Sequence, residues 1–239
     1  MATVVLIRHG RTTANSSGVL AGRASGVHLD DAGKKQAERA ATRLSGVPLA
    51  ALVTSPLVRC RETAQAIAAA QPRPLALAQD RGLIECDYGE WSGQKLAALA
   101  KLPLWKIVQT QPAAAVFPDG EGLLHMQSRV VEAVRGRDRQ VSAAHGPDAV
   151  WAAVSHGDLI KALLADALGL HLDQFQRIHV DPASISIVRF HDNRPQILGV
   201  NTHEGALDWL NPPKRRRGRS ADAAVGGGVM LVPDGEACA

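Results

Sequence analysis

The chain opens with TVVLIRHG at residues 3–10, and a comparable pattern, VWAAVSHG, occupies residues 150–157. In both stretches a short apolar run is followed by a histidine and a glycine. Short apolar runs of this kind are typical of buried strands. Side chains that follow the carboxyl ends of neighbouring parallel strands meet at one edge of a sheet. We therefore expect His9 and His156 to converge on one pocket.

The rest of the chain alternates between predicted strands and predicted helices. Further strands are expected at residues 49–54, 75–78, 184–190 and 196–200. Helices are expected from a cap at Asp30 or Asp31 to Gly46, from about Leu57 to Pro72, from Leu124 to about Val134, and over residues 158–168 with Gly169 immediately after. Residues 94–122 contain three prolines and predict short helices and loops.

This alternation predicts an α/β fold, a three-layer sandwich with a mostly parallel central sheet flanked by helices. The last two predicted strands, joined by a turn at residues 191–195, would add an antiparallel edge. Residues 1–211 are interpreted as one domain. Residues 212–239 begin with PPKRRRGRS and lack apolar periodicity, so they predict a basic, disordered tail.

The composition excludes several classes of protein. Of the 239 residues, 46% are hydrophobic and 21% are charged, which is ordinary for a globular chain and excludes wholesale disorder. No apolar run reaches the roughly 18 residues that a membrane span needs, and the N-terminus has no signal-peptide pattern. The cysteines are only three and lie far apart, which predicts neither a disulfide framework nor a metal cluster, and favours a cytoplasmic location.

Half of the net charge of +4 comes from the predicted tail, residues 212–239. Residues 212–239 hold five of the 27 basic and three of the 23 acidic side chains, so residues 1–211 carry a net charge of only +2. This gives little support for a basic binding face on the domain. We expect no nucleic-acid or membrane partner, and the sequence leaves the oligomeric state open.

The residues that follow the predicted strands suggest phosphoryl chemistry. Arg8 follows the first strand, and Arg59 lies a few residues after the second. Arginine offers forked pairs of N–H donors that match the oxygens of a phosphoryl group. A histidine between two such arginines suggests attack on phosphorus.

Five motifs together resemble a known family. They are RHG at residues 8–10, its extension RHGxTxxN at 8–15, SPLxRxxxTA at 55–64, LxExxYGxWxG at 83–93 and SHG at 155–157. Their order and spacing are similar to those of the histidine phosphatase superfamily, the phosphoglycerate-mutase-like group. The resemblance covers residues 1 to about 205 and implies that family's fold.

The resemblance also implies a role for each motif residue. His9 would be the nucleophile that forms a phosphohistidine, and Arg8 and Arg59 would clamp the phosphoryl oxygens. Positive charge on both sides of a histidine disfavours its imidazolium form, which keeps it neutral and nucleophilic near pH 7. Glu85 would protonate the leaving oxygen and then activate water. The full set for phosphate binding is Arg8, Asn15, Arg59, His156 and the Gly157 amide.

Several other side chains receive structural interpretations. Thr12 is expected to support its loop, and Asp158 to cap the helix after SHG, with proton donation as its second reading. Glu121 either faces the substrate or caps the following helix. The histidines outside the motifs show no spacing typical of metal ligands, so neither a metal nor another cofactor is expected.

The predicted function is that of a metal-independent phosphomonoesterase acting on a small phosphorylated metabolite. The alternative is a phosphoglycerate-mutase-type isomerase. Mutases of the family usually carry an arginine after the motif glutamate, where this chain has Cys86. They also carry a segment with paired arginines that bind the substrate carboxylate. Between residues 93 and 122 the chain has no arginine and three lysines, Lys95, Lys101 and Lys106.

A catalytically inactive binder of phosphorylated ligands, or a nucleic-acid adaptor that uses the tail, is the remaining alternative. The intact set of His9, Arg59, Glu85 and His156 argues against the inactive binder. The basic cluster in the tail is short and lacks the interleaved aromatic residues that would stack on bases, which argues against the adaptor.

Overall fold

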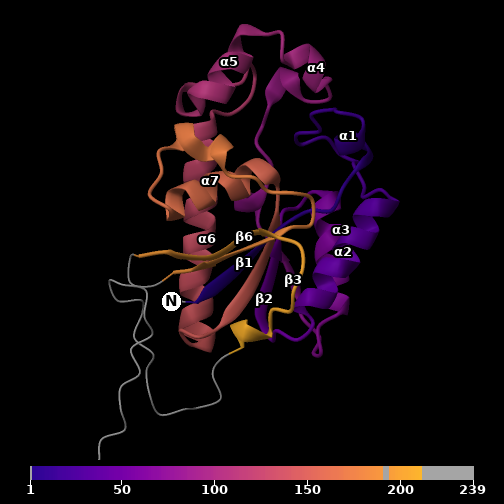
Figure 1. The fold of residues 1–239 in the computed structure, drawn as a ribbon, viewed down its shortest axis with the longest axis vertical. Coiled ribbons are helices and arrows are strands. Elements are labelled where there is room, and N and C mark those ends of the chain that lie inside the picture. The colour runs from indigo at the N-terminus through magenta and orange to yellow at the C-terminus, as the bar shows by residue number, and fades with distance from the viewer. Residues whose placement is uncertain (1, 191–193, 212–239) are drawn as a thin grey trace, which may run out of the picture.

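A computed structural model describes residues 2–190 and 194–211 of the chain (Figure 1). The predicted tail, residues 212–239, and residues 191–193 of the predicted turn lie outside the described residues. The boundary of the domain at residue 211 therefore stays a prediction.

The described part of the chain contains a six-stranded mixed sheet with the order β3-β2-β4-β1-β5-β6. The strands are β1 (Thr3–Arg8), β2 (Leu49–Thr54), β3 (Leu77–Gln79), β4 (Val150–Ser155), β5 (Ile185–Arg189) and β6 (Gln196–Thr202). The first four run parallel to one another, whereas β5 pairs antiparallel with β1 and β6 antiparallel with β5. The predicted α/β sandwich and its antiparallel final pair are confirmed.

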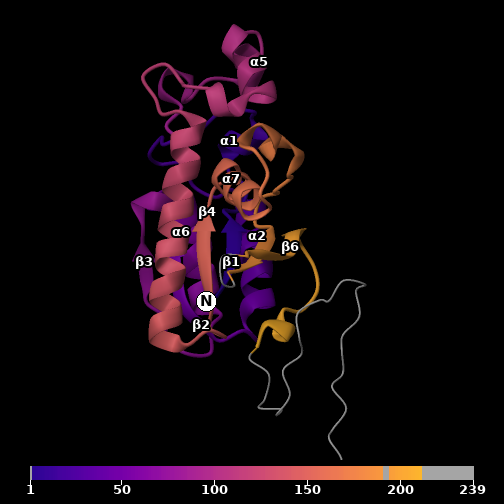
Figure 2. The same ribbon diagram turned by 90° about the vertical axis from the view of Figure 1, so that its left-hand side faces the viewer.

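Helices flank the sheet on both sides (Figures 1 and 2). They are α1 (Thr13–Ser16), α2 (Asp31–Leu44), α3 (Val58–Ala69), α4 (Leu96–Leu99), α5 (Pro103–Thr110), α6 (Leu123–His145) and α7 (Gly157–Ala167). Short 3-10 turns lie at Arg81–Leu83, Gly89–Trp91, Pro112–Ala114, Leu172–Arg177 and Asp208–Leu210.

The alternation of side chains along β1 divides the core into two clusters. Val4 and Leu6 pack with residues of α6 and α7 on one face of the sheet. Val5 and Ile7 pack with residues of α2 and α3 on the other. Successive side chains of a strand point to opposite faces, so a strand that is apolar throughout requires helices on both sides.

Helix α6 is longer than the sequence predicted. We expected it to end near Val134, but it continues past Gly136 to His145. Its extension is stabilised by Asp138, which is fully buried and accepts hydrogen bonds from the indole Nε1 of Trp151 (2.9 Å) and the backbone N–H of Ala2 (3.2 Å). Contacts with β1 and β4 thus outweigh the cost of about 1 kcal/mol that a glycine brings to a helix interior.

Smaller differences concern where elements begin and end. Asp30, and not Asp31, caps α2, because its carboxylate accepts the N–H of Gly33 at 2.7 Å. Strand β3 begins two residues later than predicted and β6 ends two residues later. Gly169 follows the end of α7 in the left-handed conformation (φ 67°), as predicted.

Residues 94–122, here called the lid segment, stand above the carboxyl ends of the parallel strands (Figures 1 and 2). The expected short helices are α4 and α5. Aromatic rings join the segment to the body of the protein: Trp105 stacks on Trp91 at 6.1 Å between ring centroids, and Phe117 meets Trp91 and Tyr88 edge to face at 5.1 and 5.0 Å. This cluster fixes the lid segment next to the site described below.

Candidate active site

The register of β1 and β4 brings the two predicted histidines together. Arg8 lies opposite Ser155 in the parallel pair, and the N–H of His9 donates to the Ser155 carbonyl at 3.0 Å. The His9 and His156 rings are 5.3 Å apart between centroids and meet edge to face. The convergence expected from the two strand ends is therefore present in the structure.

Two hydrogen bonds define the tautomer of His9. Its Nδ1–H donates to the Gly10 carbonyl at 2.7 Å, because a carbonyl oxygen can only accept. The Nε–H of Arg59 donates to His9 Nε2 at 3.2 Å, which requires a lone pair on Nε2. Burial, followed by the charges of Arg59 and Arg8, holds the pKa of His9 well below its usual value. His9 is thus neutral, with Nε2 as its nucleophilic atom.

Burial is the larger of these causes, whereas the sequence indicated only the flanking arginines. The His9 side chain is only 4% exposed. The loop that follows β1 packs closely on α2, since a Cβ at residue 10 would lie 2.4 Å from the Gly33 carbonyl oxygen.

Arg59 projects from the first turn of α3 and is only 2% exposed. Its Nη2 donates to the Gly22 carbonyl at 2.8 Å. Gly22 has a left-handed backbone (φ 51°), and a Cβ there would lie 2.6 Å from the Ser92 hydroxyl. Glycine is therefore needed to present this carbonyl to Arg59.

Arg8 is held from the opposite side of the site, where its Nη1 donates to the Val180 carbonyl at 2.7 Å. Four buried arginine donors of the described residues have no hydrogen-bond partner, and two of them belong to arginines that line the site: Nε of Arg8 and Nη1 of Arg59. Buried donors are almost always satisfied in folded proteins. Gly157 opens α7 next to the Arg8 guanidinium, since a Cβ at residue 157 would lie 3.3 Å from Arg8 Nε. The amino end of a helix and two unpartnered guanidinium donors together favour an anion.

Glu85 is 9% exposed and lies beside this pair. One oxygen, Oε1, accepts the N–H of Cys86 at 3.0 Å, and Oε2 lies 3.6 Å from His156 Nδ1. Burial, followed by the negative charge of Asp158, raises the pKa of Glu85 to about 7. A carboxyl group with this pKa exchanges its proton readily near neutral pH.

His156 belongs to the same cluster but is fully buried and stands behind Arg59. Its Nδ1 is 3.2 Å from Arg59 Nη2, and its Nε2 is 2.8 Å from the Ser55 hydroxyl. Burial, followed by the Arg59 charge, lowers the pKa of His156 well below its usual value. His156 is not among the residues that line the cavity described next, and its Nδ1 faces Arg59 and Glu85. Its predicted contact with a phosphoryl group stays a prediction.

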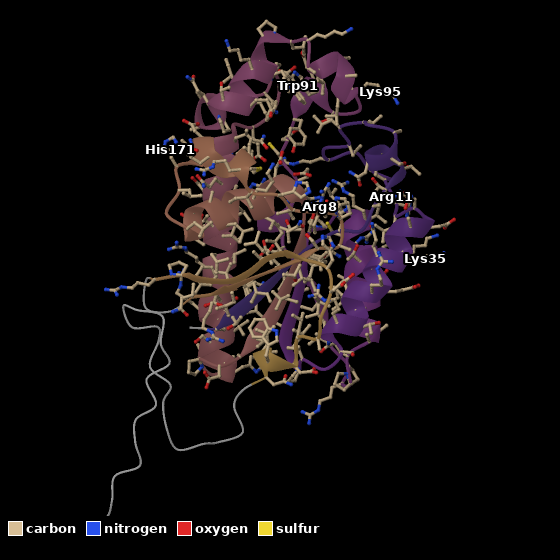
Figure 3. The ribbon with its side chains drawn as sticks, in the orientation of Figure 1. Arg8, Arg11, Lys35, Trp91, Lys95 and His171 are labelled. Carbon is tan, nitrogen blue, oxygen red and sulfur yellow. The ribbon has the colours of Figure 1, made fainter. Side chains whose placement is uncertain are left out.

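That open space is a cavity of about 520 Å³ at the carboxyl ends of the parallel strands. Arg8, labelled in Figure 3, lies at the inner part of the molecule beneath the lid segment. The cavity floor is formed by Arg8, His9, Arg59, Glu85 and Gly157. The walls contain apolar side chains (Val19, Leu20, Leu96, Ile178 and Val180) and the polar groups of Asn15, Tyr88, Asp158, Lys161 and Gln176.

Asn15 lines the cavity from α1, the short helix that follows the RHG stretch. Its Oδ1 accepts the backbone N–H of Thr12 at 3.0 Å and the Thr12 hydroxyl at 2.9 Å, and the Thr12 hydroxyl in turn accepts the Asn15 N–H. This reciprocal capping box occupies the amide oxygen. The amide nitrogen is the end of Asn15 that remains for a ligand, and Thr12 supports the loop as expected.

Two sequence expectations need correction. His156, and not Asp158, occupies the N-cap of α7, and the Asp158 carboxylate instead accepts from the Tyr88 hydroxyl (2.8 Å) and from Lys161 Nζ (3.3 Å). Asp158 lies two residues beyond the N-cap, because the helix already begins at Gly157.

Glu121 neither reaches the cavity nor caps α6. Its Oε1 pairs with Arg129 at 2.6 Å and with Arg23 at 3.0 Å, and it accepts the N–H of Asp87 at 3.0 Å. The N-cap of α6 is Gly122, which has no side chain to accept a hydrogen bond. A buried carboxylate needs such partners, and the two arginines that supply them are far from it in the sequence or on the next helix.

Several polar residues of the site were not predicted from the sequence. Tyr88, Lys161 and Gln176 line the cavity, and Ser55 contacts His156 from behind. Lys161 could have been found, because it follows Gly157 by four residues on one helix and so lies on the same face. Ser55 and Tyr88 stood inside quoted motifs without a role. Gln176 carries no signal in the sequence.

Some residues near the motifs lie away from the cavity. Arg11 pairs with Asp30 at 2.8 Å, and Figure 3 shows it on the side of α2. Cys60 and Cys86 are buried free thiols, and burial raises the pKa of Cys60 to about 12. In residues 2–190 and 194–211, no three His, Cys, Asp or Glu side chains are grouped so that they could hold a metal ion. No helix in these same ranges is long and apolar enough to span a membrane.

The fold and the site define an α/β protein whose cavity, at the carboxyl ends of the parallel strands, is lined by a neutral histidine and two arginines. A profile of the histidine phosphatase superfamily (branch 1) matches residues 4–203. The chain belongs to this superfamily, as its five motifs indicated.

The curated relatives carry several names. The "Bifunctional protein Rv2228c" of Mycobacterium tuberculosis is 34% identical over 203 residues, which are 83% of this chain and 53% of that protein. The chain thus spans about half the length of the mycobacterial relatives that it matches. "Phosphoserine phosphatase 1" of Hydrogenobacter thermophilus is 31% identical over 84% of this chain and 92% of its own length.

Solved structures show the same fold. The putative alpha-ribazole-5'-P phosphatase of Escherichia coli has a TM-score of 0.74 at 24% identity and covers 84% of this chain and 97% of its own. The native structure of the mycobacterial glucosyl-3-phosphoglycerate phosphatase Rv2419c has a TM-score of 0.74 at 25% identity and covers 83% of this chain and 98% of its own. The phosphoglycerate-mutase-like sandwich is therefore established for this chain.

Proposed function

We propose that the protein is a metal-independent phosphomonoesterase that acts on a small phosphorylated metabolite through a phosphohistidine at His9. One observation carries the proposal: the lone pair of His9 Nε2 faces Arg59, and the cavity that His9 lines also holds two buried guanidinium donors, Arg8 Nε and Arg59 Nη1, with no partner in the described part of the chain. A phosphoryl group would satisfy both donors and present its phosphorus to Nε2.

In the first step His9 Nε2 attacks phosphorus while the bond between phosphorus and the ester oxygen breaks. Glu85, which is substantially protonated at neutral pH because of its raised pKa, gives its proton to the leaving alcohol. In the second step the Glu85 carboxylate takes a proton from water. The resulting hydroxide oxygen bonds to phosphorus, the phosphorus–nitrogen bond breaks, and inorganic phosphate and neutral His9 are restored.

The remaining residues would stabilise the charge that spreads over the phosphoryl oxygens. Arg8 and Arg59 supply fixed donors on two sides. The Asn15 amide nitrogen and the Gly157 N–H at the start of α7 supply two more. His156 supports Arg59 from behind and is proposed to contact a phosphoryl oxygen through Nδ1.

The lid segment supports hydrolysis over isomerisation. A mutase must grip the rest of its substrate while the phosphoryl group is on the enzyme. Of the lid segment only Leu96 lines the cavity. Lys95 donates to the Ser17 carbonyl at 2.9 Å, and Figure 3 shows it pointing outward. The relatives named as phosphatases of phosphoserine and of glucosyl-3-phosphoglycerate support a small phosphorylated substrate.

Trapping the intermediate tests the proposal. The protein is mixed with an aryl phosphate and quenched within the first turnovers, with and without a chelator. We expect one acid-labile, base-stable phosphoryl group on His9 in both samples, and no adduct or turnover for His9→Ala. Activity that survives in His9→Ala, or that a chelator abolishes and Mg²⁺ restores, would contradict the proposal.

The mutase alternative favoured by a 26% identical relative, a 2,3-bisphosphoglycerate-dependent phosphoglycerate mutase of Thermoplasma acidophilum, needs its own test. The protein is incubated with 3-phosphoglycerate, with and without the 2,3-bisphosphate. We expect phosphate release from some other phosphomonoester to exceed any isomerisation. Isomerisation much faster than phosphate release would overturn hydrolysis and leave the role of His9 standing.

A cytoplasmic location stays a prediction from cysteine usage. The two described cysteines are buried and unpaired, which is consistent with a reducing compartment.

A further inference from the structure

Ser55 is a fully buried serine at the end of β2 that makes a short contact with a site histidine. Strand β2 is the direct neighbour of β4, and the Ser55 N–H donates to the Val154 carbonyl at 2.9 Å. This backbone contact directs the Ser55 hydroxyl at His156, where Oγ lies 2.8 Å from Nε2. Ser55 does not line the cavity described above, so any effect it has on a ligand passes through His156.

The two nitrogens of His156 face opposite kinds of neighbour. On the Nδ1 side, Arg59 Nη2 at 3.2 Å can only donate, and the one carboxylate oxygen nearby, Glu85 Oε2, lies beyond hydrogen-bond distance at 3.6 Å. Nδ1 must therefore hold a lone pair in the free protein, and the single ring proton belongs to Nε2. On the Nε2 side, the Ser55 hydroxyl is an acceptor at hydrogen-bond distance, and the softer Cys60 sulfur lies farther away at 3.5 Å.

We propose that Ser55 is the positioning residue of His156: its oxygen accepts Nε2–H and thereby reserves Nδ1 for the phosphoryl group. This inference rests on the proposed function, because it assigns a task to His156 in that reaction. Without the hydroxyl, Nε2–H would be a buried donor whose nearest alternative is a weakly accepting sulfur. The ring would then be free to rotate or to change tautomer.

Binding of a phosphoryl dianion requires Nδ1 of His156 to change from a hydrogen-bond acceptor to a donor. Phosphoryl oxygens only accept, so Nδ1 must carry a proton to contact them. Because Nε2–H is already held by Ser55, the proton is added from solvent and not moved across the ring. His156 becomes an imidazolium that faces the dianion, and one proton is taken up for each phosphoryl group bound.

The surroundings of His156 explain why the proton arrives only with the ligand. The charged and titratable groups that face it are Arg59 and Cys60 from α3, Arg8 and His9 from the end of β1, Glu85 from the loop after β3, and Arg129 from α6. The three arginines oppose a further positive charge. A bound dianion compensates two of them at the site and so permits protonation.

Nitrogen-15 spectra of the histidines test this assignment directly. We expect the free protein to show His156 as the Nε2–H tautomer, and inorganic phosphate at pH 7.5 to convert it to the doubly protonated ring. Ser55→Ala should give a mixture of tautomers in the free protein. An Nδ1–H tautomer in the free wild type, or a neutral ring in the phosphate complex, would overturn the proposal.

Kinetics supply the second readout, with a matched control. Ser184 is also a buried serine near the carboxyl ends of the strands, but its hydroxyl has no partner among the described residues. We expect Ser55→Ala to lower kcat about tenfold to 100-fold, as loss of a group that orients a site histidine commonly does. Ser184→Ala should change kcat less than twofold. Equal melting temperatures of the two variants would exclude misfolding as the cause.

A double-mutant cycle separates failure of this inference from failure of the proposed function. If Ser55 acts only through His156, Ser55→Ala should cause no further loss in a His156→Ala background. Full activity of His156→Ala itself would refute the role of that histidine in the proposed reaction. A large loss in His156→Ala together with wild-type activity of Ser55→Ala would refute the present inference alone.

Discussion

The floor of the cavity and the lid segment are built by opposite means. In the floor, His9, Arg59 and Glu85 are buried, and backbone carbonyls hold the two arginines, as Gly22 holds Arg59 and Val180 holds Arg8. The lid segment is fixed by stacked aromatic rings, with apolar side chains such as Leu102 and Ile107 exposed. Hydrogen bonds hold a group to within fractions of an ångström, whereas apolar packing is non-directional.

This difference indicates what each region contributes. The fixed, directional donors of the floor fit the phosphoryl group of the proposed reaction, whose oxygens only accept. The lid segment contributes mainly packing, since of its residues Leu96 alone lines the cavity. Substitutions in the floor should therefore change catalysis with little effect on stability, and substitutions in the lid should do the reverse.

The largest expected effect in the floor is that of Glu85→Gln. The amide cannot give a proton to the leaving oxygen, so kcat/KM for an alkyl phosphate should fall by about 10²- to 10⁴-fold. An aryl phosphate, whose leaving group needs less protonation, should lose much less in the first step. Glu90→Gln is the control, since Glu90 is exposed five residues further along the same segment. Equal losses for both substrates would refute the acid role of Glu85.

Arg59→Lys should be the next most harmful change. Lysine keeps the charge but loses the fork that serves His9 Nε2, Gly22 and the ligand at once. Loss of one such oriented donor costs about 10²- to 10³-fold in kcat. Arg61→Lys, on the exposed side of the same helix, should leave kcat unchanged. Steady-state rates of the two variants make the comparison, and wild-type activity of Arg59→Lys would show that charge alone suffices.

The pH dependence sharpens the account of the floor. The raised pKa of Glu85, about 7, means that kcat/KM should fall as pH rises through neutrality and the acid loses its proton. Removing the Asp158 charge by Asp158→Asn lowers that pKa, so the falling limb should move to lower pH. Asp166→Asn is the control. It removes another carboxylate of α7, which is paired with Arg135 of α6, and should leave the pH of the falling limb unchanged. If the falling limb of kcat/KM moved to higher pH in Asp158→Asn, the Asp158 charge could not be a cause of the raised Glu85 pKa.

In the lid segment the expected effect is on stability. Trp105→Ala removes the ring stacked on Trp91 and should cost about 2 kcal/mol, less than a fully buried tryptophan because Trp105 is only partly buried. That corresponds to a fall of about 4–8 °C in melting temperature at this chain length. Trp209→Ala, at a 55% exposed tryptophan, is the matched control and should change little. A thousandfold loss of activity in Trp105→Ala would break the division between floor and lid.

The smallest effect is expected from deleting residues 212–239. Their sequence has no apolar periodicity with which to bury surface on the domain. The melting temperature and the rate of aryl phosphate hydrolysis should both stay close to those of the full chain. A fall of more than a few degrees, about 1 kcal/mol at this size, would show that this segment docks on the domain.

Much of the fold was predictable because strand and helix patterns are local. The apolar runs at residues 3–7, 49–54 and 150–155 formed strands within one residue of their predicted limits. The end of α6 was missed, since Asp138 is satisfied only by Trp151 and Ala2, which no local pattern connects to it. Glu121 was misread for the same reason, because its partner Arg23 is 98 residues away.

The sequence by itself determined the class of fold, the family and the residues that gather at the strand ends, because these depend on periodicity and on motifs of a few residues. Only the tertiary structure decided the chemical state of those residues. The neutral tautomer of His9, the raised pKa of Glu85 and the contact of Ser55 with His156 all depend on burial and on partners 50 to 100 residues distant. Solvent exclusion and hydrogen-bond geometry arise when the chain closes on itself, and no short segment contains them.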